Sequence, residues 1–147
     1  MNYKYFWVIF VYKCLRKEIK IFLKNKNSNF IPFLIEGVKP REFAKIKELF
    51  IKLTGINERV CFPNRFFEYS HQLSFEQKSK KIIISSTSVR LLDNFHPNSL
   101  LEEGEWFPKY EVLEKLRYDK MFLRSFKKEF GGDSFWECLN TRLHTKK

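Results

Sequence analysis

The sequence is poor in several residue types, and each shortage excludes a class of protein. In 147 residues there are three cysteines, five prolines, five glycines and a single alanine. Three cysteines are too few to staple a small secreted scaffold, and so little proline and glycine excludes collagen-like and low-complexity chains. No uncharged apolar run approaches the roughly 18–20 residues that a membrane-spanning helix needs. We therefore expect a single domain over residues 1–147.

The sequence also lacks the short motifs that carry common chemistries. Cys14, Cys61 and Cys138 form no CxxC pair and no Cys/His set at metal-ligand spacing. No glycine-rich phosphate loop is present either. We therefore expect reduced and buried thiols, a cytoplasmic location, no metal, no cofactor and no assigned catalytic residue.

Aromatic and basic residues are abundant instead. Phenylalanine occurs 17 times, and 28 lysines and arginines exceed 17 aspartates and glutamates, for a formal net charge of +11. Codons rich in A and T also favour Lys, Phe and Asn over Ala and Gly, so part of this bias needs no function. The pI near 9.6 nevertheless favours polyanionic partners, namely nucleic acid or an anionic lipid surface.

The positive charge is concentrated near the N-terminus, where residues 1–30 hold seven bases and one acid. Residues 5–12 are aromatic and β-branched, which predicts a buried strand. Lysines then recur at steps of four, three and four, which predicts an amphipathic helix over 13–24. One helix over 3–24 and an atypical targeting segment are the alternatives. The predicted polyanion-binding site is the basic stripe of this helix: Lys13, Arg16, Lys17, Lys20 and Lys24.

Three further helices are predicted from apolar spacing and from residues that begin or end helices. Pro40 and Gly55 bracket the first. The longest runs from Pro108 to Gly131, and Asp133 caps a last helix that packs back against it. The expected contact between these two helices is a hydrophobic cluster of Phe126, Phe130, Trp136 and Leu139.

Short strands are predicted at 5–12, 30–35 and 82–86, although a helix over 75–93 fits the third segment about equally well. The predicted fold is therefore α+β, a single compact, mostly helical domain with a small sheet. An all-α fold is the close alternative.

Two histidines and one aspartate are candidate chemical groups. His71 and His96 could act as general acid and base in a metal-independent ribonuclease, because imidazole titrates near neutral pH. An exposed or hydrogen-bonded structural histidine is the commoner case. Asp119 falls near the centre of the apolar face of the helix over 108–130. We expect it to pair with a cation or to be exposed, since an unpaired buried carboxylate is costly.

Three functions compete on this basis. The favoured one is a small basic protein that binds a polyanion, chiefly nucleic acid, without catalysis. The second is a protein-interaction module, either an inhibitor or an accessory subunit. The third is a small RNA-directed nuclease or toxin. Peripheral contact with an anionic membrane is a further use of the same basic stripe.

Overall fold

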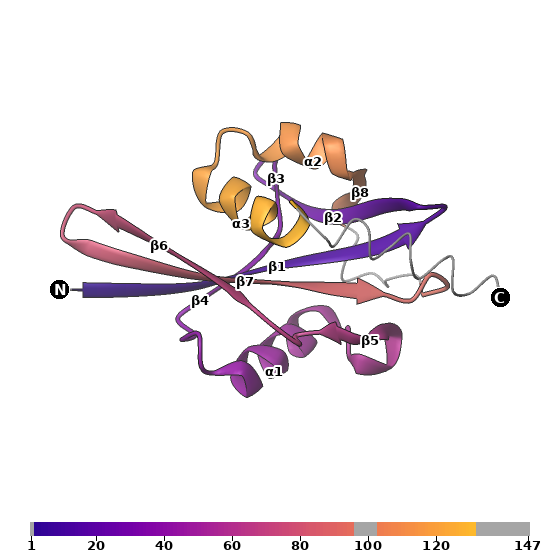
Figure 1. The fold of residues 1–147 in the computed structure, drawn as a ribbon, viewed down its shortest axis with the longest axis horizontal. Coiled ribbons are helices and arrows are strands. Elements are labelled where there is room, and N and C mark those ends of the chain that lie inside the picture. Colours follow the sequence, from indigo (N-terminus) through magenta and orange to yellow (C-terminus); the bar gives the residue numbers. More distant parts are fainter. Residues whose placement is uncertain (1, 96–102, 132–147) are drawn as a thin grey trace.

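The computed structural model describes residues 2–95 and 103–131, which build one mixed sheet with helices on both faces (Figure 1). Strands account for 49% and helices for 28% of the structure. The predicted mostly helical α+β domain is therefore wrong, and so is the all-α alternative. The strands are β1 (Asn2–Leu15), β2 (Glu18–Lys26), β3 (Asn29–Ile31), β4 (Phe33–Glu36), β5 (Cys61–Phe66), β6 (His71–Gln77), β7 (Lys80–Leu91) and β8 (Gly104–Pro108). The helices are α1 (Phe43–Thr54), α2 (Lys109–Leu116) and α3 (Lys120–Phe130), with a 3-10 turn at Glu58–Val60.

Two long parallel strands, β1 and β7, form the centre of the sheet, whose main order is β3-β2-β1-β7-β5. The other edge of β1 pairs first with β4 and then with β2, both antiparallel. Strand β7 is likewise flanked by β6 along its first half and by β5 near its end. Within the described residues β6 pairs with β7 alone, so it lies at an edge of the sheet.

Side chains of β1 alternate between two hydrophobic cores. Trp7 and Ile9 belong to the core under α1, whereas Val8 and Phe10 belong to the core under α2 and α3. Figure 1 shows α1 on one side of the sheet and the other two helices on the opposite side. A strand covered on both faces reads as a continuous apolar run, which is why the strand predicted over 5–12 is confirmed.

The basic helix predicted over 13–24 does not form, and neither does a helix over 3–24. Strand β1 continues to Leu15, and Arg16 and Lys17 make a two-residue hairpin turn into β2. Both turn residues have positive φ, 51° and 66°, as a type I′ turn requires. Such turns usually contain Asn or Gly. Because Arg16 and Lys17 do not indicate a turn, the lysine spacing was interpreted as a helical period.

The other elements are a mixture of confirmed and corrected predictions. The helix between Pro40 and Gly55 is confirmed as α1, and Gly55 ends it with a left-handed φ of 75°. The strands predicted at 30–35 and 82–86 lie within β3, β4 and β7. The helix over 75–93 is wrong, because β6 and β7 form a hairpin there.

The helix predicted over 108–130 is divided into α2 and α3 at Asp119. The carboxylate of Asp119 accepts a hydrogen bond from the Phe122 N–H at 3.0 Å and caps α3. Asp119 is exposed, so the expectation of an exposed or paired carboxylate is confirmed. The helix after Asp133 and its cluster residues Trp136 and Leu139 lie outside the described residues.

We expect Asp119→Ala to destabilise the protein by about 1 kcal/mol, because the Phe122 N–H at the start of α3 loses its hydrogen-bond acceptor. Asp119→Asn is the matched control, since asparagine caps helices about as well as aspartate. The free energy of unfolding in urea measures both changes. Equal stability of the alanine variant and the parent would show that the cap contributes nothing.

The cysteines depart in part from expectation. Cys61 is a free, buried thiol, and burial together with the Glu58 charge raises its pKa to about 12. Cys14 is disulfide-bonded, so the expectation of fully reduced thiols is wrong. Among the described helices, none combines the length and the apolar character needed to cross a bilayer.

Candidate functional site

The five residues predicted to bind a polyanion do not form one surface. Lys13 is buried in β1 with 5% of its surface exposed, and it lies opposite Lys20 of β2. Lys20 forms an ion pair with Glu18 at 3.5 Å. Lys24 sits over the Phe33 ring, and the hairpin turn carries the remaining two residues, Arg16 and Lys17.

Burial lowers the pKa of Lys13, and the Asp93 carboxylate opposes this shift in part. Between the lowered pKa and the ordinary value of the unfolded chain, the unfolded state holds more protons, so stability rises with pH in that interval. Lys13→Met should remove this rise and stabilise the fold by about 1 kcal/mol at neutral pH, because a desolvated charge is lost. Urea unfolding at neutral and alkaline pH tests this, with exposed Lys26→Met as control. A destabilised Lys13→Met variant would contradict it.

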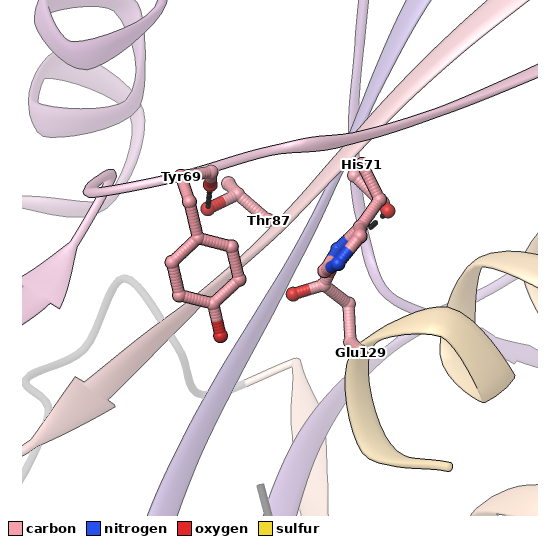
Figure 2. A network of polar contacts seen from close by, with 5 residues as sticks. Tyr69, His71, Thr87 and Glu129 are labelled. Atoms are coloured by element: carbon pink, nitrogen blue, oxygen red, sulfur yellow. Dashed lines mark hydrogen bonds and ion pairs between the residues drawn. The ribbon is translucent and has the colours of Figure 1, made fainter. Parts of the chain in front are cut away.

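His71 and Glu129 meet between the edge strand β6 and helix α3, as Figure 2 shows, and Ser86 of β7 joins them. Nδ1 of His71 lies 2.7 Å from Oε2 of Glu129, and the Ser86 hydroxyl donates to the same oxygen at 3.0 Å. The Glu129 side chain is 0% exposed and that of His71 is 39% exposed. A carboxylate is thus held in the interior by two partners, while the imidazole reaches solvent.

Local structure explains this meeting. His71 and Ser86 are opposite each other in the β6–β7 pairing, so their side chains lie on the sheet face that α3 covers. On α3, Glu129 belongs to the buried stripe that includes Phe122 and Phe126. These rings pack into the core and turn the glutamate inward with them.

A hydrogen bond to Tyr69 holds the segment before β6 near His71. The Thr87 hydroxyl of β7 donates to the Tyr69 carbonyl at 2.7 Å, as Figure 2 shows. The Tyr69 ring meets the His71 ring edge-on, with centroids 5.5 Å apart. The imidazole is therefore bounded by an aromatic ring on one side and by a buried carboxylate on another.

This arrangement can move a proton. With its proton on Nδ1, His71 donates to Glu129 and keeps the lone pair of Nε2 available. A buried carboxylate in this position fixes the orientation of the ring and stabilises the imidazolium that forms when Nε2 accepts a proton. The other histidine predicted for chemistry, His96, lies outside the described residues.

Helix α3, which carries Glu129, also carries several positive side chains. The Arg124 guanidinium lies 4.6 Å from the centroid of the Phe75 ring on β6. Lys127 and Lys128 occupy the last turn of α3 and are exposed. Because Arg124 and Lys128 are four residues apart, they lie on the same side of the helix, about 5–6 Å apart at Cβ.

A separate hollow of about 550 Å³ opens on the other face of the sheet, beside the start of α1. Cations, aromatic rings and polar groups line it, a mixture that suits nucleotides. None of these lining residues is a carboxylate or an imidazole, so the hollow offers binding without an evident proton acceptor. Its lining is Tyr5, Lys39, Pro40, Arg41, Phe43, Ser70 and Gln72.

The fold recurs in solved structures. The crystal structure of an Ap4A hydrolase from C. elegans aligns with a TM-score of 0.58 and 14% identity, over 87% of this chain and 98% of that chain. A binary complex of a C. elegans Ap4A hydrolase aligns with a TM-score of 0.56 and 15% identity, over 84% and 95%. The chain has a Nudix-like fold. No protein-family model and no curated protein sequence matches it.

Helix α1 of this Nudix-like fold does not fit a divalent cation. Enzymes that act on phosphate groups commonly hold Mg²⁺ with carboxylates. In α1 the one carboxylate is Glu48, and Glu42, just before the helix, accepts a hydrogen bond from the Lys39 N–H at 2.8 Å. Within the described parts of the chain, no three His, Cys, Asp or Glu side chains gather as metal ligands. The remaining charged residues of α1 are Lys45, Lys47 and Lys52.

These findings correct the functional expectation. The two solved structures that share the fold are Ap4A hydrolases, so the expectation of a polyanion binder without catalysis is wrong. The helix that supplied the basic stripe is also absent, because its residues are divided between two strands and a turn. Sequence reasoning had named His71 but missed Glu129, the residue that gives the histidine a chemical role.

Proposed function

We propose that this chain is a hydrolase of nucleotide-type phosphate compounds, with His71 as its general base. The observation that carries the proposal is the 2.7 Å contact between His71 Nδ1 and the buried Glu129 carboxylate. The shared fold with two Ap4A hydrolase structures supports the choice of substrate class. Helix α1 supplies no site for a divalent cation, so no step of the reaction is assigned to one.

The reaction begins with a water molecule between His71 and the substrate. Nε2 of His71 takes a proton from this water, and the water oxygen bonds to phosphorus. The bond from phosphorus to the bridging oxygen then breaks, and the electron pair stays with the departing oxygen. The imidazolium returns its proton to that oxygen, so one water is consumed and His71 is restored. Glu129 stabilises the imidazolium between these two proton transfers.

The position of the pair favours this role over a purely internal contact. A buried carboxylate is costly unless it is well paired, and Glu129 is paired with an imidazole that is still 39% exposed. Paired titratable groups at the border of core and solvent are a common feature of functional sites. Tyr69 adds an exposed aromatic ring beside the imidazole, on which a base or sugar face could pack.

The proposal is tested by incubating the full chain with Ap4A and separating the nucleotide products by anion-exchange chromatography. We expect products that increase linearly with time and with protein concentration. Ser74→Ala is a suitable control variant, because Ser74 is exposed on β6 and outside the His71 contacts. Unchanged Ap4A after prolonged incubation with a large amount of folded protein would contradict the proposed hydrolase.

A further inference from the structure

We propose that Arg124 and Lys128 of α3 bind the phosphates of the substrate at the His71 site, and that the reaction there uses no divalent cation on α1. This inference rests on the proposed function and adds to it the residues that hold the reacting group. It also states a cofactor requirement, namely that the reaction proceeds without Mg²⁺ bound to α1.

Arg124 is held over Phe75 of β6, and His71 begins the same strand. Lys128 lies one helical turn farther along α3 and directly precedes Glu129, the partner of His71. The two cations therefore lie on one side of α3, with Arg124 over the residue four positions along β6 from His71 and Lys128 next to the glutamate that contacts His71.

Helix α3 carries four cations, Lys120, Arg124, Lys127 and Lys128, and one carboxylate, Glu129. That carboxylate is turned inward and has 0% exposed side-chain surface. The solvent side of the helix is therefore positive, and the end of α3 nearest His71 is where its cations are most concentrated.

A guanidinium binds phosphate oxygens through two parallel N–H donors, and a lysine ammonium adds a point charge. Cationic side chains can neutralise the charge that develops on a transferring phosphoryl group. This is the task that a divalent cation performs elsewhere, and the carboxylates needed to hold one are missing from α1.

The lysines of α1 cannot take this role at His71, because α1 covers the opposite face of the sheet (Figure 1). Lys47 and Lys52 belong to that helix. They provide charge-matched controls for a change of Arg124 or Lys128. A double variant of Lys47 and Lys52 to glutamine removes the same charge from the molecule at a distant place.

The test compares Arg124→Gln/Lys128→Gln with Lys47→Gln/Lys52→Gln, each at equal ionic strength with EDTA and with Mg²⁺. We expect the parent to cleave Ap4A at equal rates in both buffers. The α3 variant should lose about 10–100-fold in kcat/KM, as expected for lost hydrogen bonds to charged groups. The α1 variant should keep the parent rate. Circular dichroism checks that all variants are folded.

Binding is measured separately by calorimetry in EDTA, with Ap4A and the His71→Asn protein. Adding Arg124→Gln and Lys128→Gln to the His71→Asn protein should weaken its binding of Ap4A about tenfold or more. Unchanged binding would overturn the inference even if no variant shows turnover. Turnover that requires Mg²⁺, or an α3 variant as active as the parent, would overturn it and leave the proposed function standing. No turnover by the parent in either buffer would contradict the proposed function itself.

Discussion

Replacing His71 with asparagine should lower kcat for Ap4A hydrolysis by about 10²–10⁴-fold, the usual contribution of a general base. The asparagine amide N–H replaces Nδ1–H as a donor to Glu129. The buried carboxylate therefore keeps a partner, and the variant should fold with nearly unchanged stability. Because the phosphate contacts are elsewhere, KM should change much less than kcat.

The kinetic constants are compared with those of Ser74→Ala, which alters the same strand without touching His71 or Glu129. A thermal melt of each variant checks that the fold is intact. A folded His71→Asn protein with the kcat of the parent would show that His71 has no part in the reaction.

Truncation of Phe130 should have the largest effect on stability, about 3–5 kcal/mol for Phe130→Ala. The residue is 0% exposed. Its ring lies 5.7 Å from that of Phe10, 5.3 Å from that of Tyr12 and 5.2 Å from that of Phe126, measured between centroids. The substitution leaves a cavity where α3 meets the centre of β1, and neighbouring rings can fill it only in part.

Urea unfolding measures this loss, with Tyr118→Ala as the control. Tyr118 is 86% exposed, so its removal should change stability by no more than about 0.5 kcal/mol. A loss below about 1 kcal/mol for Phe130→Ala would place it outside the usual range for buried aromatics. The packing of α3 against β1 would then contribute little to stability.

Some of the fold could be predicted from local signals. The apolar run at 5–12 indicated a strand covered on both faces, and β1 is such a strand. Gly55 marked the end of α1 because glycine tolerates a left-handed end, whereas Pro40 lies three residues before Phe43, where the helix begins. In both cases a local preference and the long-range packing agree.

The hairpin between β1 and β2 could not be predicted in this way. Its turn residues, Arg16 and Lys17, are not typical of a type I′ turn. The pairing of β1 with β7 is a contact between residues far apart in the chain, and spacing within 13–24 carries no information about it. The lysine spacing was therefore interpreted as a helix over 13–24, and the predicted helix content was too high.

Of the two residues that form the candidate site, only His71 was predicted from the sequence. His71 drew attention as an imidazole near aromatic residues, but its partner is 58 residues away. The signal for Glu129 was present, since it shares a helical stripe with Phe122 and Phe126. The prediction that placed Asp119 on an apolar face assumed one continuous helix over 108–130. The division into α2 and α3 makes Asp119 an exposed cap and leaves Glu129 as the buried carboxylate.

The most direct test of the account is the protonation of the His71 ring in the folded protein. Long-range proton–nitrogen NMR on histidine-labelled protein distinguishes the two ring nitrogens, and His71→Asn identifies the signal among three histidines. At mildly alkaline pH we expect a protonated Nδ1 and an unprotonated Nε2, with the Nδ1 signal altered in Glu129→Gln. A neutral ring protonated on Nε2, or a signal indifferent to Glu129→Gln, would contradict the claim that Glu129 holds His71 as a general base.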